Sequence, residues 1–267
     1  MKIVVCIKQV PDTADIKWTE NNTMMREGVE SIMNPFDEYG VETAIRLKES
    51  MGGEAHITVM TMGPPQAKDA LKKALAMGCD SAMLISDKKF AAADTWATSK
   101  TVSQAIKDKI SDFDLIICGQ FAIDGDTGQV GPSVAEALEI PQVTYCKELA
   151  YNKDNNTIIA TKAIESGIIK RELQLPGLVC MLKCDYSPRM PNIKGVMRAN
   201  KTDIPAYGMA DLNLELDEVG LKGSPTFVAK SYRQPPRTQG ELINQGDTKA
   251  NVNLLIEKLR DKKVILQ

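Results

Sequence analysis

A glycine-rich polar segment near the middle of the chain carries the residues best suited to bind a ligand. Residues 119–131 read Gly-Gln-Phe-Ala-Ile-Asp-Gly-Asp-Thr-Gly-Gln-Val-Gly and join an apolar run to a helical pattern. Glycines let the backbone approach a ligand, and the N-terminus of the next helix offers unpaired N–H groups at the positive end of its dipole. Thr127 and Gln129 add side-chain donors. The segment therefore predicts an anion site. A plain strand-to-helix turn is the alternative, because neither GxxxxGKS/T nor GxGxxG is present.

Two aspartates of this segment are of the wrong charge to contact a phosphate directly. Asp124 and Asp126 lie between the glycines and the expected helix. Aspartates in such a position accept hydrogen bonds from backbone N–H groups as helix caps. They can also bind ribose hydroxyls or Mg²⁺. The sequence leaves both roles open.

Residues typical of a self-sufficient catalytic site are scarce. His56 is the only histidine, and we expect it to be a strand residue with a satisfied ring. The six cysteines form no CxxC pair, which predicts small buried residues in a reducing cytosol and no metal site. No GxSxG or HExxH motif is present. We therefore expect a protein that holds a cofactor rather than one with catalytic residues of its own.

The composition excludes two classes of partner. Of the 267 residues, 33 are Lys or Arg and 35 are Asp or Glu, a net charge of −2, so there is no basic excess for nucleic acid. No run reaches the roughly 20 apolar residues that a membrane helix needs. The chain also starts directly in a strand pattern without a leader-like segment. We expect a cytoplasmic protein that does not insert into membranes.

Strand and helix patterns alternate through the first half of the chain. We expect strands at residues 3–7, 56–62, 81–85 and 114–118, and helices at 67–75, 95–110 and 130–138. Asp94 is the expected N-cap of the second helix, and Gly78 the stop of the first. Such alternation predicts an α/β fold with a doubly wound, mostly parallel sheet. Ligands bind beyond the carboxyl ends of such strands, where residues 119–131 begin.

The pattern changes after Pro141. Residues 157–163 and 168–175 predict a β-hairpin, and 178–182 a strand that returns to the sheet. Residues 220–246 are rich in Gly and Pro and precede a short helix. We therefore expect an α/β domain at 1–219, with its hairpin at 157–175, and a C-terminal arm at 220–267 that wraps a partner. Arg189 is interpreted as a solvated turn residue, and Met190 as a partner anchor or a buried plug.

Several motifs together resemble the β subunit of electron transfer flavoproteins along essentially the whole chain. Residues 6–12 are similar to the family's first strand and loop, and residues 33–37 (Met-Asn-Pro-Phe-Asp) to a second block. Residues 120–129 and 182–193 resemble two further blocks, and residues 163–179 resemble the family signature. The resemblance implies a sheet of the adenine-nucleotide-binding type and a heterodimer with an α subunit.

The resemblance also implies a cofactor site. The adenosine pocket would be lined by residues from the first strand, the block at 33–37 and the strand at 56–62, namely Cys6, Asn34, Pro35, Phe36, Asp37 and Met62. The phosphates would be held by residues of the glycine-rich segment, namely Gly119, Asp124, Gly125, Asp126, Thr127, Gly128, Gln129 and Val130. In the respiratory branch of the family this pocket holds AMP. In the electron-bifurcating branch of anaerobes it holds FAD.

Three stretches resemble the bifurcating branch, namely residues 93–99, 124–132 and 220–226. FAD needs more polar donors than AMP, and Thr95 and Thr98 would supply them, so the resemblance favours FAD with AMP as the alternative. NADH would be the electron donor. Ferredoxin or flavodoxin would accept one electron, and the other would pass through the α-subunit FAD to a flavin-dependent dehydrogenase of the acyl-CoA or lactate type. Arg189 and Met190 would dock that dehydrogenase. A more distant alternative is an ATP-binding enzyme or nucleotide sensor.

Overall fold

The computed structural model describes residues 1–12, 31–229, 240–244 and 246–265. They divide into two compact units, Met1–Ser231 and Tyr232–Gln267. The second unit contains helix α6 (Thr248–Asp261), which Asp247 caps by accepting a hydrogen bond from the Ala250 N–H. None of the described helices is both long and apolar enough to cross a membrane.

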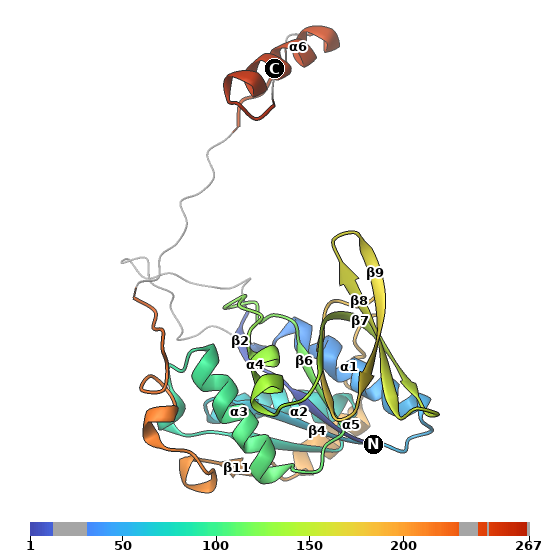
Figure 1. Cartoon of the computed structure of the whole chain (residues 1–267), viewed down its shortest axis with the longest axis vertical. Coiled ribbons are helices and arrows are strands. Elements are labelled where there is room, and N and C mark those ends of the chain that lie inside the picture. The colour runs from blue at the N-terminus through green and yellow to red at the C-terminus, as the bar shows by residue number, and fades with distance from the viewer. Residues whose placement is uncertain (13–30, 230–239, 245, 266–267) are drawn as a thin grey trace. The chain divides into compact units, whose positions relative to one another are not determined.

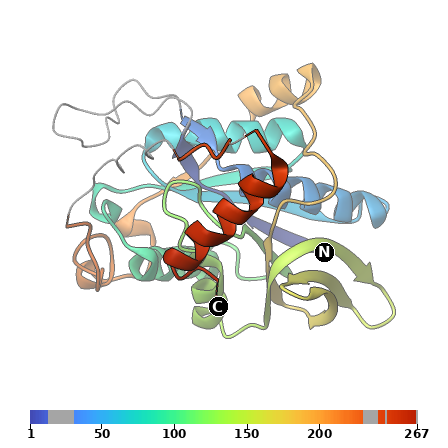
Figure 2. The same cartoon turned by 90° about the horizontal axis from the view of Figure 1, so that it is seen from above.

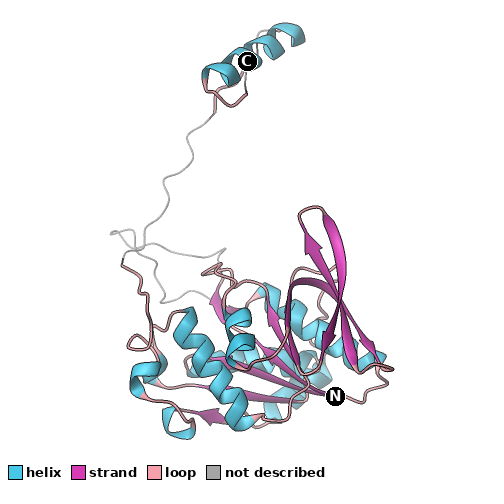
Figure 3. Ribbon diagram, in the orientation of Figure 1, coloured by secondary structure: helices cyan, strands magenta, loops and turns pink. Residues whose placement is uncertain are grey.

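One sheet of nine strands organises the first unit (Figures 1 and 3). The strand order is β11-β5-β4-β1-β6-β10-β7-β8-β9. Every pairing from β11 to β7 is parallel, and β8 and β9 continue the sheet in antiparallel fashion. The strands are β1 (Lys2–Cys6), β4 (His56–Met62), β5 (Ser81–Ile85), β6 (Leu115–Gly119), β7 (Gln142–Asn152), β8 (Thr157–Ile164), β9 (Gly167–Gln174), β10 (Gly177–Met181) and β11 (Ala206–Tyr207). A separate antiparallel pair joins β2 (Gln9–Pro11) to β3 (Ser31–Met33).

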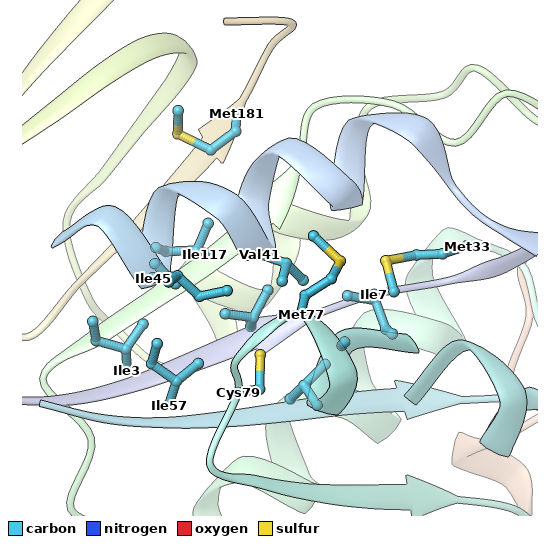
Figure 4. Packing of buried hydrophobic residues seen from close by; sticks show 14 of the residues in the cluster. Ile3, Ile7, Met33, Val41, Ile45, Ile57, Met77, Cys79, Ile117 and Met181 are labelled. Carbon is cyan, nitrogen blue, oxygen red and sulfur yellow. The ribbon is translucent and has the colours of Figure 1, made fainter. Parts of the chain in front are cut away.

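Helices cover both faces of the parallel sheet (Figure 2). They are α1 (Pro35–Ser50), α2 (Lys68–Met77), α3 (Thr95–Lys109), α4 (Val130–Ala137) and α5 (Ile193–Lys201). Side chains of α1, α2 and α5 share one apolar cluster with Ile3 and Val5 of β1, whereas α3 and α4 share the other with Val4. Figure 4 shows Val41 and Ile45 of α1 beside the sheet residues of the first cluster. Burial on both faces explains the continuous β-branched run of β1.

The predicted α/β fold with a doubly wound, mostly parallel sheet is confirmed. The expected strands and helices of the first half are present, and Asp94 caps α3 through the Ala97 N–H at 3.0 Å. The hairpin is formed by β8 and β9, and β10 returns between β6 and β7. His56 is satisfied by Ser81, with 2.9 Å between Nε2 and Oγ. All six cysteines are free, and five of them are buried.

Three larger elements were not predicted, each for a physical reason. Helix α1 buries Asp37, Glu42 and Thr43 as well as apolar residues, so its apolar periodicity is weak. Strand β7 is partly exposed and carries charged residues along its antiparallel half. Helix α5 follows two prolines and starts at Asn192, whose side chain accepts from the Gly195 N–H. Polar burial, edge exposure and local capping are features that apolar periodicity alone does not report.

The segment after residue 219 remains attached to the first unit for several residues. The Ser224 hydroxyl accepts a hydrogen bond from the Asp94 N–H at 2.8 Å. Thr226 donates its N–H and its hydroxyl to the same Asp94 carboxylate, at 3.0 and 2.8 Å. The two compact units divide between Ser231 and Tyr232, and the predicted domain boundary after residue 219 stays a prediction. Wrapping of a partner by the C-terminal arm stays a prediction.

Close packing of α4 on the sheet gives a first testable prediction. A Cβ at Gly131 would overlap Sγ of Cys180 on β10. We expect Gly131→Ala to lower the free energy of unfolding in urea by about 1–3 kcal/mol, the usual cost of overpacking. Gly125→Ala is the matched control, because a Cβ there meets nothing within 4 Å. Addition of Cys180→Ala should remove most of the penalty, and a Gly131→Ala variant as stable as the wild type would contradict this packing.

Candidate functional site

The candidate site lies where the sheet reverses its winding direction. From β1 the chain winds outward through β4 and β5, and β6 then begins the other half on the opposite side of β1. Loops that follow β1 and β6 therefore leave in opposite directions, and ligands of such α/β proteins bind between the two loops; we call this region, at the carboxyl ends of β1 and β6, the crevice. Cys6 ends β1, Met62 ends β4 and Gly119 ends β6, so the structure brings these three predicted residues to one edge.

A buried carboxyl joins the two sides of this crevice. Asp37, in the first turn of α1, accepts the Lys8 N–H at 2.6 Å and also the N–H of Gly119. Lys8 lies just past β1, and Gly119 ends β6. A Cβ at Gly119 would overlap the Asp37 carboxyl, so glycine is required there for close approach. One side chain thus fixes the ends of both strands.

Burial decides the titration of this carboxyl. Removal from water raises the pKa of Asp37 to about 7, although the hydrogen bonds from Asn34, Lys8 and Gly119 act in the opposite direction. The positive end of the α1 dipole also favours the ionised form. The carboxyl therefore changes charge near neutral pH.

Asn34 holds the loop between β6 and α4 against the start of α1. Its side-chain amide donates to the Phe121 carbonyl at 2.7 Å, and its carbonyl accepts the Ile123 N–H at 3.2 Å. Phe121 also packs edge-on against Phe36 and Tyr145, with ring centroids 5.7 and 5.8 Å apart. The side chains of Asn34 and Phe36 therefore shape this wall of the site.

Asp124 makes an ion pair across the crevice. Both of its carboxylate oxygens lie close to Lys8 Nζ, at 2.7 and 2.8 Å. Capping of the following helix, one of the two roles left open for Asp124, is excluded, because α4 begins after Gln129 and its N-terminus has no side-chain cap in the described part of the chain. Asp126 is exposed and has a φ of 52°, and it does not cap the helix either. Lys8 was not predicted as a site residue, although it lies within the motif at residues 6–12.

The start of α4 is open and lies beside the start of α3. The hydroxyl of Thr95 donates to the Gln129 side chain at 2.7 Å. Thr98 is half-buried one turn further along α3. Because no side chain caps α4, the N–H groups of its first turn are available to an anion. Two helix N-termini thus meet at the crevice.

The glycines of the loop have different environments. Gly128 has a φ of 62° and packs against the Phe121 ring, so a side chain there would be strained. Gly125 lies in an exposed turn, where its N–H bonds to the Ala122 carbonyl at 3.1 Å. Thr127 is exposed, and Val130 begins α4. The residues predicted to bind phosphate therefore form one continuous loop around an open helix start.

Two cysteines near the crevice, Cys118 and Cys180, are buried and are not suited to nucleophilic chemistry, because the pKa of both thiols is raised, that of Cys118 by a hydrogen bond with Cys6 and by burial. Cys6, Cys118 and Cys180 are register partners across β1, β6 and β10. Burial raises the pKa of the Cys180 thiol to about 12, which keeps it protonated. No group of His, Cys, Asp and Glu within the described residues could hold a metal ion.

The predicted docking residues are anchored to α1. Arg189 donates from Nε to Glu42 at 2.8 Å and from Nη1 to Glu49 at 2.7 Å. These hydrogen bonds raise the pKa of Arg189 above its ordinary value, and the bond to Glu49 has the largest effect. The interpretation of Arg189 as a solvated turn residue is therefore wrong. Met190 is 85% exposed, so the alternative of a buried plug is wrong as well.

The Asp37 carboxyl gives a prediction with a defined pH dependence. We expect Asp37→Asn to destabilise the protein by about 1–3 kcal/mol at neutral pH, because one of two buried N–H donors would then face an NH₂ group. The native carboxyl binds its proton more tightly than the unfolded one, so the wild-type free energy of unfolding gains a contribution at low pH. That contribution is lost as pH rises from about 4 to about 7.

Urea unfolding at pH 5, 6, 7 and 8 measures this dependence. The stability of the wild type relative to Asp37→Asn should decrease between pH 5 and 7 and then stay constant. A difference that does not change with pH would contradict the raised pKa of Asp37.

Comparison with known proteins points to one family. A family model described as "Electron transfer flavoprotein domain" matches residues 21–212. The electron transfer flavoprotein subunit beta of Thermoanaerobacterium thermosaccharolyticum is 44% identical over 99% of this chain and 100% of its own length. The subunit of the same name from Megasphaera elsdenii is 43% identical over the same shares. The caffeyl-CoA reductase-Etf complex subunit CarD of Acetobacterium woodii is 41% identical, also over 99% and 100%.

Both the match to the family model and full-length identity above 40% to beta subunits agree with the motifs and the fold. The chain belongs to the electron transfer flavoprotein family and is similar to its beta subunits over its whole length.

Proposed function

We propose that this chain holds an FAD in the crevice between β1 and β6 and transfers electrons as part of an electron-bifurcating flavoprotein. The observation that carries the proposal is the meeting of two helix N-termini at this crevice, joined by the Thr95–Gln129 bond. The open start of α4 suits the pyrophosphate of a dinucleotide. The polar start of α3, with Thr95 and Thr98, offers donors to the part of FAD that extends beyond the pyrophosphate.

Several features of the residues present suit such a cofactor. Gly119 leaves no side chain between the strand ends, and Gly128 turns the loop with a positive φ. Asn34 holds the loop by two hydrogen bonds, so the N–H groups at the start of α4 are preorganised. Preorganised donors bind an anion without the entropy cost of ordering a loop.

The chemistry that FAD would supply in this site is acceptance of hydride from NADH, with one electron passed to ferredoxin or flavodoxin and the other passed through the FAD of an α subunit to a dehydrogenase. The protein supplies binding, orientation and electrostatic tuning for such chemistry. One relative is named as part of a caffeyl-CoA reductase-Etf complex, which supports a flavin-dependent dehydrogenase as the final acceptor here as well. A β subunit also implies an α subunit as its partner.

We further propose that Met190 docks this dehydrogenase and that Arg189 positions it. Met190 is exposed on a segment that Arg189 anchors to Glu42 and Glu49 of α1. Glu42 is buried, and burial alone would raise its pKa, but the bonds from Arg189 and Arg46 outweigh burial and lower it. An anchored segment that presents an apolar side chain to solvent is well suited to fill a pocket on a partner.

Cofactor content tests the proposed function. We expect the purified heterodimer to release two FAD and no AMP, and NADH to reduce the FAD of this subunit. Quantification after acid or heat extraction, with separation of FAD from AMP, measures the content of both nucleotides. One FAD together with one AMP would instead assign the non-bifurcating role, in which AMP is a structural cofactor.

Substitution of Met190 tests the docking assignment. We expect Met190→Glu to reduce electron transfer to the dehydrogenase by about tenfold or more, because a charge in an apolar pocket is costly. FAD content and NADH reduction should not change. Met190→Leu is the matched control and should retain transfer. Unchanged transfer in Met190→Glu would contradict the assignment.

A further inference from the structure

An ion pair between Lys8 and Asp124 lies beside the proposed cofactor site. Lys8 Nζ contacts both oxygens of Asp124, so two of its three N–H donors face one carboxylate. The pair connects the loop after β1 to the loop after β6, on the two sides of the proposed cofactor site. Its side chains are partly exposed, at 49% for Lys8 and 24% for Asp124, which is consistent with a position at the crevice rather than in the core.

Neither partner is free to move away through its backbone. The Lys8 N–H is held by the Asp37 carboxyl, and the Lys8 carbonyl accepts the Asn34 N–H at 2.9 Å. Asp124 directly follows Ile123, whose N–H bonds to the Asn34 side chain, and it lies within a turn closed on the Ala122 carbonyl by the N–H groups of Gly125 and Asp126. The carboxylate of Asp124 is therefore fixed within the loop that leads to α4.

A fixed carboxylate in a phosphate-binding loop would oppose binding. At the short distances within one loop, an unpaired negative charge repels a phosphate even when solvent reduces the interaction. An ammonium that contacts both carboxylate oxygens leaves a pair with no net charge and only a local dipole. The N–H groups of α4 can then act on an anion without this repulsion.

We propose that Lys8 neutralises Asp124, so that the loop between β6 and α4 accepts a diphosphate that its own carboxylate would otherwise repel. Lys8 is thus a positioning residue for selectivity, which favours charged nucleotides over uncharged nucleosides. The inference rests on the proposed function, since it concerns the phosphates of a nucleotide in the same site. It assigns Asp124 no direct contact with phosphate, ribose or Mg²⁺.

A double-mutant cycle with two probes tests the inference. The full chain, freed of nucleotide, is titrated calorimetrically with ADP and with adenosine at low salt. Lys8→Met should weaken ADP binding about tenfold, because an unpaired charge then lies in the loop, and should change adenosine binding less than about twofold. Asp124→Asn should bind ADP at least as tightly as the wild type. The double variant Lys8→Met/Asp124→Asn should return to within about twofold of the wild type.

Two further measurements separate neutralisation from other roles. The deficit of Lys8→Met should shrink strongly in 1 M salt, where the Debye length is about 3 Å. Lys2→Met is the matched control, since Lys2 pairs with Asp112 at the other end of the same strand, and it should not change binding of either probe.

Three other outcomes of these titrations would overturn the proposal that Lys8 neutralises Asp124. A double variant as weak as Lys8→Met would assign a direct contact between Lys8 and phosphate. Equal losses for ADP and adenosine in both single variants would assign a purely structural link between the loops. Weaker ADP binding in Asp124→Asn alone would also contradict neutralisation, and this result does not depend on the folding of Lys8→Met. A wild-type chain that binds neither probe would instead contradict the proposed function.

Discussion

One buried carboxyl, that of Asp37, holds together the two halves of the doubly wound sheet at their ligand-binding edge. It receives N–H groups from Lys8 after β1 and from Gly119 at the end of β6, two positions far apart in sequence. Without such an acceptor, two backbone donors would be buried and unsatisfied at the point where the sheet reverses direction. Asp37 itself is placed by the start of α1. The strand ends, the helix and the crevice therefore form one structural unit.

Helix α1 extends this unit toward a second surface. Its first turn carries Asp37, its middle carries Glu42, and its last turns carry Glu49, so the helix that fixes the crevice also anchors Arg189. At the N-terminus of α1, the side chain of Asn34 fixes the loop that leads to α4. The Thr95–Gln129 bond then joins α4 to α3. The proposed cofactor site and the proposed docking segment thus share a rigid support. Sites built on such a support keep their geometry with little loss of entropy on binding.

The sequence predicted those parts of the structure that depend on local pattern. Continuous β-branched runs, amphipathic helices and the Asp94 cap led to the correct fold class, because these signals lie within short windows. Contacts between distant residues were not predictable. The role of Asp124 stayed open between helix capping and ligand binding, since its partner Lys8 is 116 residues away in sequence. Arg189 was interpreted as solvated, since its partners Glu42 and Glu49 lie on helix α1. The apolar pattern did not predict this helix, because it buries polar residues as well. Ion pairs and buried carboxyls are decided by tertiary proximity, which a single sequence does not reveal.

The central claim is that the crevice between β1 and β6 binds the phosphates of a nucleotide at the start of α4. Backbone amide NMR shifts of the isotope-labelled full chain, titrated with ADP and then with adenosine, test it most directly. We expect ADP to shift the amide signals of residues 119–131, with Val130 and Gly131 among the largest changes. Adenosine should leave the signals of Val130 and Gly131 almost unchanged. The claim would be contradicted if ADP moved the amides at the opposite edge of the sheet, around Lys2 and Asp112, while those of Val130 and Gly131 stayed in place.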